Sequence, residues 1–466
     1  MVQQYNEQNE LETEIQVPED RLKGRLFSNR DLFLLIGPLL IEQFLSIFTG
    51  LADSIMVSRV GEAAVSGVSL IDSIMILLIY IFSALATGGA VIAGQYLGRN
   101  DPQKARQGAN DLMWFAALFS LAVMALIYAG RLFILNVVFG KVEPDVWTCA
   151  NTYLLITGAS IPFLAVYNAG AAIFRTVGNA RVTMVISLIA NGVNIAGNAV
   201  CIYGLNMGTE GVAIPTLISR LLSALIVSVL LCNARHPLSL DRSLRHHFDW
   251  NMVKRILRIG IPGGLENGMF QLGRIMLISL VSGFSTAAIT ANAITGTLSS
   301  FQVISGHAVE LTETTVISRC VGAGDYEQAK YYNKKLILIT YVSLWCVNLL
   351  IVLALNFILG LYHLTSETEA LTRQLIWIHT LSAVLIWPLT FDLPAMFRAA
   401  GDVRFAMVTS IVSMWVFRLG TAYVLALGFE LGVLGVWLAM VADWAFRAIL
   451  FTGRYISGRW QNHRAV

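Results

Sequence analysis

Long apolar segments, separated by short polar connections, recur along almost the whole chain. About 20 apolar residues are enough for a helix to cross the hydrocarbon core of a bilayer, so each segment predicts a membrane span. Several segments are longer, which predicts tilt or extension beyond the bilayer. The alternating pattern of membrane barrels is not found in the sequence, so an all-α polytopic protein is expected. The predicted spans, about twelve, lie near residues 32–57, 66–97, 110–139, 148–175, 180–203, 211–234, 252–283, 288–320, 333–361, 368–398, 403–427 and 433–456.

Composition supports a membrane protein and excludes several other classes. Apolar residues make up 56% of the chain and charged residues 13%, whereas a soluble domain carries about 25% charge. A nucleic-acid partner is not expected, because no basic stripe or aromatic-basic interleaving is present. The cysteines are scattered singly, without disulfide or metal-ligand spacing. No nucleophile elbow, phosphate loop or zinc motif is found, so neither an enzyme nor a resident cofactor is predicted.

The distribution of basic residues predicts the orientation. With the N-terminus inside, most loop lysines and arginines fall on the inner side, and the outer loops hold only Arg59, Arg131, Lys141 and Arg373. Cytoplasmic loops of membrane proteins carry such an excess of basic residues. We therefore expect a multi-pass protein of the plasma membrane with both termini in the cytoplasm and an even number of spans.

The sequence repeats itself at a spacing of about 224 residues. Because each half contains about six spans, and six is even, both halves cross the membrane in the same direction. The matched segments are 38–43 with 262–267, 98–101 with 322–325, 174–179 with 397–402, and Gly204 and Gly211 with Gly428 and Gly435. This repeat predicts two parallel six-helix bundles around a central cavity, related by an axis along the membrane normal.

The repeat divides the chain into two predicted lobes. The N-lobe covers residues 32–234 with spans 1–6, and the C-lobe covers residues 252–456 with spans 7–12. A polar stretch at 235–251 is the predicted cytoplasmic linker. Residues 1–31, which lack the apolar run of a signal peptide, and residues 457–466 are expected to be cytoplasmic.

Several segments point to a known family. They are Gly50–Val57 in the first span, the Gly-Gln-Tyr-Leu-Gly run at 94–98, the paired Arg-x-x-Gly-[Asn/Asp] turns, and Asn194-x-x-x-Asn198 in the fifth span. With these features the chain resembles the multidrug and toxic compound extrusion (MATE) family of the multidrug/oligosaccharidyl-lipid/polysaccharide exporter superfamily. The resemblance implies two bundles in a V that export cationic or amphipathic compounds in exchange for Na⁺ or H⁺. A monomer surrounded by membrane lipids is expected.

Polar residues in the N-lobe spans are the first candidate site. A charge inside a bilayer costs about 2.5–3.5 kcal/mol on insertion scales. The presence of Asp53 in the first span therefore indicates a role that offsets this cost. The resemblance implies that Asp53, Asn194, Asn198 and Thr216 form a cation or proton site; Asn168 in the fourth span is a further candidate. Carboxylate, amide and hydroxyl oxygens suit a hard cation such as Na⁺, and a desolvated carboxyl could carry a proton instead. The alternative is interhelical hydrogen bonding that only joins the helices.

Acidic residues in the C-lobe form a second set of candidates for substrate binding or coupling. Glu266 lies in the seventh span and Asp392 in the tenth. Acidic residues on these two helices bind Na⁺ in one branch of the family, but both positions are displaced here from that pattern. Glu266 is also the repeat partner of Glu42 in the first span, which lies near the face that carries Asp53.

The eighth span carries a polar stripe of His307, Glu310 and Glu313, spaced three residues apart. We predict that this stripe lines a cavity for cationic substrates, with a proton relay, a weak zinc site or a solvated vestibule wall as alternatives. Arg175 and Arg398 are expected to reach toward lipid headgroups. Ion-pair roles are expected for Arg220, Arg274, Arg418, Asp443 and Arg447.

The sequence favours a secondary antiporter that exports organic compounds. One alternative is a lipid-linked substrate flippase of the same superfamily, which usually has extra spans and an arginine-rich cavity. A less favoured alternative is an intramembrane enzyme, for which only His307, Glu310 and Glu313 come near a reactive cluster.

Overall fold

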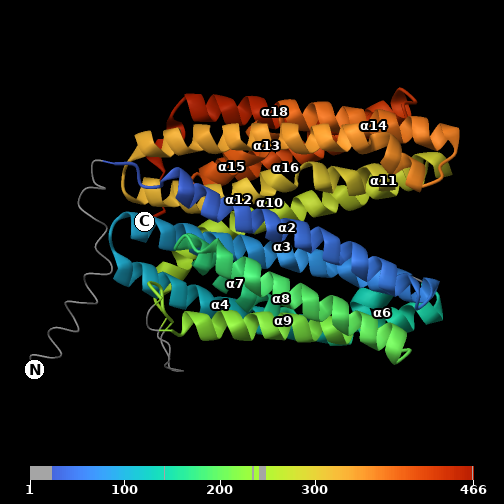
Figure 1. The fold of residues 1–466 in the computed structure, drawn as a ribbon, viewed down its shortest axis with the longest axis horizontal. Coiled ribbons are helices and arrows are strands. Elements are labelled where there is room, and N and C mark those ends of the chain that lie inside the picture. The colour runs from blue at the N-terminus through green and yellow to red at the C-terminus, as the bar shows by residue number, and fades with distance from the viewer. Residues whose placement is uncertain (1–23, 141, 234–235, 241–247, 464) are drawn as a thin grey trace, which may run out of the picture.

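The computed structural model describes residues 24–140, 142–233, 236–240, 248–463 and 465–466. Within these ranges the regular structure is entirely helical, as predicted, and forms two bundles side by side (Figure 1). The N-lobe comprises α2 (Asn29–Ser58), α3 (Glu62–Gly98), α4 (Pro102–Ala129), α5 (Arg131–Phe133), η2 (Ile134–Val138), α6 (Pro144–Gly158), α7 (Ile161–Thr176), α8 (Ala180–Ala199), η3 (Val200–Gly204) and α9 (Glu210–Leu231).

The C-lobe follows from Trp250 onward. It comprises α10 (Trp250–Ser282), α11 (Thr286–Gln302), α12 (Ile304–Gly322), α13 (Tyr326–Leu361), α14 (Ser366–Leu385), α15 (Trp387–Ala400), α16 (Val403–Val412), η4 (Ser413–Gly420), α17 (Thr421–Tyr423), η5 (Val424–Gly428), α18 (Val433–Ile456) and η6 (Arg459–Asn462). Most of the predicted N-terminal segment and part of the predicted linker lie outside the described residues.

The described helices account for the predicted membrane spans. Eight helices are long and apolar enough to cross a membrane, and the bent pairs α6–α7 and α14–α15 raise that number to ten. The α10 helix and the α11–α12 pair fill the two remaining positions. Their charged side chains, such as Arg258 and Arg274 on α10 and Arg319 on α12, lower their hydropathy.

The backbone repeats as closely as the sequence does. The α6–α7 pair bends by 47° and α14–α15 by 49°, with Pro162 and Pro388 in the first turns after the breaks, because proline cannot continue a preceding helix. Left-handed residues recur in the same places, at Gly178 and Gly401, with φ of 90° and 98°. The side chains of Asp101 and Asp325 both cap the following helix. The predicted repeat is therefore present in the local geometry.

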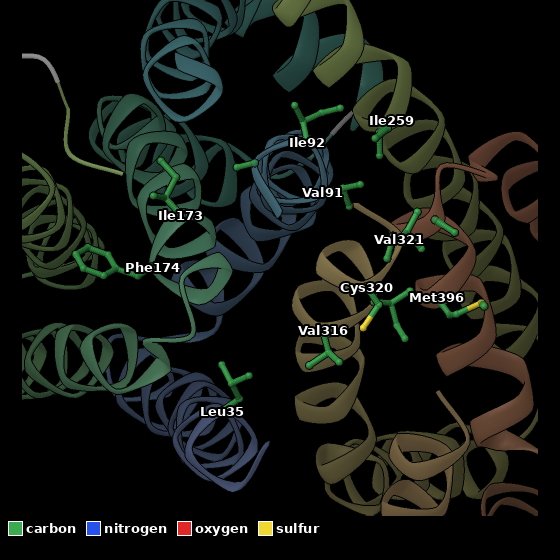
Figure 2. Packing of buried hydrophobic residues seen from close by; sticks show 14 of the residues in the cluster. Leu35, Val91, Ile92, Ile173, Phe174, Ile259, Val316, Cys320, Val321 and Met396 are labelled. Carbon is green, nitrogen blue, oxygen red and sulfur yellow. The ribbon is translucent and has the colours of Figure 1, made fainter. Parts of the chain in front are cut away.

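The lobes meet where α3 crosses α12, with α10 packed along α3. Val91 and Ile92 on α3 share one apolar core with Ile259 on α10 and Val321 on α12 (Figure 2). The crossing requires glycine on both helices. A Cβ at Gly98 would collide with the Arg319 carbonyl oxygen, and one at Gly322 would collide with the Gln95 backbone. Small residues allow such close approach of membrane helices.

Two equivalent hydrogen bonds join the lobes at this crossing of α3 and α12, which we call the seam. Gln95 on α3 donates from Nε2 to the Ala399 carbonyl oxygen at the end of α15, at 2.9 Å. Arg319 on α12 donates to the Thr176 carbonyl oxygen at the end of α7, at 2.7 Å. Gln95 and Arg319 are repeat partners at the spacing of 224, and Thr176 and Ala399 are partners at 223. Each lobe thus donates the same bond to the other.

The described ends of the chain lie at this closed end of the molecule. The Phe27 backbone exchanges hydrogen bonds with the Tyr332 hydroxyl at the start of α13, at 2.8 and 2.7 Å. Arg99, just after α3, donates to the Val466 carbonyl oxygen at 2.7 Å. The two bundles separate toward the opposite end (Figure 1).

Candidate functional site

A polar cavity of about 300 Å³ lies inside the N-lobe, between α2, α7, α8 and α9. Side chains with oxygen or nitrogen atoms form most of its wall. Its lining residues are Glu42, Gln43, Ser46, Thr49, Asp53, Leu164, Tyr167, Ser187, Ala190, Asn191, Asn194, Thr216, Ser219, Arg220 and Ser223. The cavity thus contains three of the four residues that the family resemblance assigned to the N-lobe site, and the fourth, Asn198, is bonded to its wall.

A chain of hydrogen bonds joins these four residues. Asn198 donates from Nδ2 to Asp53 Oδ1 at 2.7 Å and lies 3.4 Å from Asn194 Oδ1. Asn194 donates to the Thr216 hydroxyl at 3.2 Å, and Thr216 donates to the Val212 carbonyl at 2.9 Å. Helices α2, α8 and α9 therefore each contribute to one connected polar group.

Asp53 has no ion-pair partner among the described residues. Arg220 lines the same cavity, but its guanidinium donates to the Ser160 hydroxyl at 2.7 Å, and it forms no described ion pair, contrary to expectation. The Asn198 Oδ1 and Thr49 Oγ1 atoms are buried without a hydrogen-bond partner in the described chain. Buried polar atoms are normally paired. A carboxylate beside such oxygens suits a small hard cation or a proton.

Two further N-lobe candidates take different places. Asn168 on α7 is not part of the cavity wall, and its buried Nδ2 has no described partner. Glu42 does line the cavity. It accepts a hydrogen bond from Thr183 at 2.9 Å and lies 3.9 Å from Arg175. Arg175 thus turns inward to a carboxylate rather than outward to headgroups.

Sequence reasoning missed Asp72 on α3. The Tyr153 hydroxyl on α6 donates to Asp72 Oδ1 at 3.1 Å, which places a further intramembrane carboxyl in the N-lobe. A single acidic residue inside a long apolar run was the signal that could have found it. Asp72 lies outside the cavity wall.

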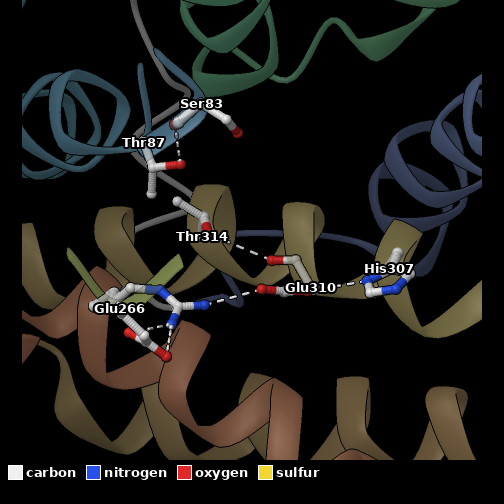
Figure 3. A network of polar contacts seen from close by, with 7 residues as sticks. Ser83, Thr87, Glu266, His307, Glu310 and Thr314 are labelled. Carbon is white, nitrogen blue, oxygen red and sulfur yellow. Dashed lines mark hydrogen bonds and ion pairs between the residues drawn. The ribbon is translucent and has the colours of Figure 1, made fainter. Parts of the chain in front are cut away.

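The C-lobe candidates form an ion-pair network instead of one binding wall. Arg398 on α15 lies 3.4 Å from Glu266 on α10 and 2.9 Å from Glu310 on α12. His307 Nδ1 lies 3.4 Å from the other Glu310 oxygen. Figure 3 shows Glu266, Glu310 and His307 in one row, with the Thr314 hydroxyl bonded to the Glu310 backbone carbonyl. Arg398, like Arg175, therefore serves as a half-buried ion-pair partner and not as a headgroup contact.

The predicted stripe on the eighth span does not line one cavity. His307 faces a cavity of the C-lobe, Glu310 is paired, and Glu313 is 0% exposed without a described hydrogen-bond partner. A step of three residues turns about 300° around the helix, which is about 60° short of a full turn. The directions of the His307 and Glu313 side chains therefore differ by about 120°. Asp392 is also 0% exposed and forms no ion pair with a described residue. The described residues contain no group of three acidic, His or Cys side chains suited to a metal.

A second cavity, of about 540 Å³, lies in the C-lobe. Gln43 and Ile47 of α2 and Tyr80 of α3 complete its wall from the N-lobe side, so Gln43 borders both cavities. Sequence reasoning missed His379, which lines this cavity and lies 2.5 Å from Gln302 Oε1. The signal was a histidine in the middle of the tenth predicted span.

Comparison with known proteins agrees with this architecture. The model of the MatE family matches residues 38–200 and again residues 262–424, together more than half of the chain. The two matched regions are displaced by 224 residues, the spacing of the internal repeat. The family model therefore recognises both halves separately.

Relatives and solved structures cover nearly the full length. The chain is 27% identical to the uncharacterized transporter YisQ of Bacillus subtilis over 92% of this chain and 94% of the relative. It is 26% identical to the probable multidrug resistance protein NorM of Thermotoga maritima, over 94% of each chain. An outward-facing multidrug resistance MATE transporter structure superposes with a TM-score of 0.86, at 20% identity, over 93% of this chain and 96% of that chain.

The two matches to the family model and the twelve-helix fold lead to one assignment. Members of this family are transporters and not enzymes. The chain belongs to the MatE family and is a multi-spanning membrane transporter of the MATE multidrug efflux class.

Proposed function

We propose that the chain is a secondary antiporter that exports small organic molecules in exchange for Na⁺ or H⁺. The observation that carries this proposal is the N-lobe cavity, where Asp53 lies among amide and hydroxyl groups and forms no described ion pair, although Arg220 lines the same cavity. A charge placed at such cost in a membrane needs a ligand or a proton to balance it. The names of the relatives, which include probable multidrug resistance proteins, support small organic substrates.

Coupling follows from differential affinity. A ligand shifts a conformational equilibrium only as far as it binds one state more tightly than the other. Ion binding at Asp53 would draw α2, α8 and α9 together, because these helices supply the oxygens. Substrate and ion would then favour different conformations of the N-lobe, and the seam between the lobes would open and close in turn.

The substrates need not be restricted to cations. The acidic stripe that predicted cationic substrates is divided between an ion pair at Glu310 and the buried Glu313. The alternative function, a lipid-linked substrate flippase, is favoured by one observation: Arg274 and Arg418 line the larger cavity, and guanidinium groups bind phosphate. We propose export of soluble organic compounds as the main function.

The experiment is efflux from liposomes that contain the purified protein and a fluorescent substrate dye, under a Na⁺ gradient or a pH gradient. Asp53→Asn should abolish gradient-driven efflux while dye binding and folding persist. Asp392→Asn makes the same chemical change at a buried carboxyl of the other lobe and should leave coupling intact. Uphill efflux at the wild-type rate by Asp53→Asn would overturn the proposal and make Glu266 and Asp392 the leading coupling candidates.

We also propose a plasma-membrane protein, active as a monomer, with both ends in the cytoplasm, because the basic residues gather on that side. The described chain ends lie at one end of the molecule, as this orientation requires. Tags at each end and in the 235–251 linker should be labelled only after cells are opened. Labelling of the linker in sealed cells would refute the orientation.

A further inference from the structure

The C-lobe cavity differs in chemistry from a site for cations. Its described wall contains no aspartate or glutamate. Aromatic side chains form much of the wall, from Phe270, Phe391, Trp387, Trp437 and Trp444. The charged and titratable members are Arg274, Arg418, His307 and His379. An organic cation would find aromatic faces here but no carboxylate to balance its charge.

Positive charge is in excess beside this cavity. Asp443 on α18 accepts from Arg447 Nε at 2.9 Å and lies 3.4 Å from Arg418 NH1 on η4. Both guanidinium groups also lie over the Phe270 ring, at 5.4 and 5.6 Å. One buried carboxylate therefore serves two arginines, as the predicted ion-pair roles of these three residues require.

Arg274 on α10 adds a third guanidinium. It lies within electrostatic range of Arg418, and it has no hydrogen bond or ion pair to a described residue, contrary to its predicted ion-pair role. Its side chain is exposed to the cavity. Arg418 and Arg447 thus share one carboxylate, and Arg274 adds a third positive charge without an ion-pair partner in the described chain. An uncompensated charge in a membrane is costly.

Hydrogen-bond donors are also in excess. Arg418 Nε and Trp444 Nε1 are buried and have no acceptor in the described chain. Trp437 Nε1, in contrast, donates to Asn292 Oδ1 at 3.0 Å. A buried donor without an acceptor costs free energy, so a ligand rich in acceptor oxygens would satisfy these groups. The volume of about 540 Å³ is in the range of small-molecule sites.

We infer that the C-lobe cavity binds organic anions, namely a carboxylate, sulfonate or phosphate group carried on an aromatic body. The anionic group would lie between Arg274 and Arg418, where guanidinium groups can donate paired hydrogen bonds. The aromatic body would pack on the tryptophan and phenylalanine rings. This inference rests on the proposed export function, because it names the substrate class of that transporter.

The test is equilibrium binding to the full chain in nanodiscs of zwitterionic phosphatidylcholine, followed by quenching of tryptophan fluorescence. The probes are naphthalene sulfonate and naphthyl trimethylammonium, which share one ring system and differ in charge. The sulfonate should bind at least about ten-fold more tightly, because a hydrogen bond to a charged group contributes that much or more.

Arg274 is the residue to change, since it has no described partner and its loss breaks no ion pair. Arg274→Gln should weaken sulfonate binding by about ten-fold, and Arg274→Glu should reverse the preference toward trimethylammonium. The matched control is Arg373→Gln, which removes an arginine that pairs with Glu369 at 2.7 Å, outside the cavity wall. It should leave both affinities unchanged.

The outcomes separate the possibilities. Equal binding of the two probes, or sulfonate binding that Arg274→Gln leaves unchanged, would overturn the inference. A second series of nanodiscs, which contain phosphatidylglycerol, distinguishes two sources of the anion. If this lipid displaces the sulfonate, the ligand of the cavity is a lipid headgroup. If the sulfonate stays bound, the ligand is a soluble anion. Binding needs no ion gradient, so failure here is distinct from failure of coupling at Asp53.

Discussion

The two lobes share one backbone plan and carry opposite chemistry at equivalent places. At the repeat spacing of 224 residues, Asp53 corresponds to Leu277 and Asn194 to Arg418. The carboxylate and amide of the N-lobe cavity are thus replaced by an apolar side chain and a guanidinium. Leu277 and Arg418 line the C-lobe cavity, as Asp53 and Asn194 line the N-lobe cavity. The two cavities therefore share these two repeat positions but differ in the chemistry of the side chains there.

This difference indicates a division of labour. Bends, caps and left-handed turns are retained in both halves because packing of the helices depends on them. Side chains in the cavities are free of that constraint, so each lobe could acquire its own ligand. Function therefore resides in the cavity residues and not in the repeated scaffold.

The comparison first predicts that Asp443 and Asp53 have different roles. Asp443→Asn would leave Arg418 and Arg447 without their carboxylate, and breaking a buried pair costs about 3–5 kcal/mol. The thermal unfolding midpoint of the purified protein should fall markedly. Asp53→Asn breaks no described ion pair and should leave the midpoint near the wild-type value. Similar falls in both variants would contradict the distinction between a structural and an ion-binding carboxylate.

A second prediction places the C-lobe residue in the N-lobe. Asn194→Arg would introduce beside Asp53 the guanidinium that Arg418 supplies at the equivalent position. The new ion pair would compete with the coupling ion and lower its apparent affinity by about a hundred-fold, or about 3 kcal/mol. Ion-dependent quenching or ion-driven efflux measures this change. Asn194→Gln, which retains an amide, is the control, and equal effects of the two changes would refute the equivalence.

The smallest expected effect concerns a single neutral ligand. Asn198→Ala removes the amide that donates to Asp53 at 2.7 Å but leaves the carboxylate in place. Loss of one hydrogen bond costs about 1–1.5 kcal/mol, so ion affinity should fall by about ten-fold. Titration of efflux against ion concentration provides the measurement. An unchanged midpoint would show that Asn198 supports the helices without contacting the ion.

The scaffold was predictable from the sequence because apolar periodicity and the repeat are local signals. Hydrophobic length predicted the spans, and matched glycine turns predicted the two halves, which the helices and the family model confirm. The grouping of Asp53, Asn194, Asn198 and Thr216 came from the family resemblance, and the hydrogen bonds connect these residues.

The C-lobe chemistry was not predictable because it depends on which side chains meet across helices. Arg398 lies near Glu310 only through the packing of α15 against α12. The stripe on the eighth span is not gathered on one face of the helix because spacing by threes turns around the helix, so Glu313 points away from His307. The excess of arginine over carboxylate near Asp443 requires residues from α10, η4 and α18, which are far apart in sequence.

The seam between the lobes also bears on how the two halves of the chain originated. Gln95 bonds to the partner lobe in the same way as Arg319 does, and Gly98 and Gly322 approach each other's backbone equivalently. An interface in which each partner presents the same patch to the other is the isologous interface of a two-fold homodimer. The two halves of this chain are joined as two separate copies of a six-helix protein would pair, with their shared axis along the membrane normal. A gene duplication that fused such a dimer would have kept this interface while the two cavities diverged.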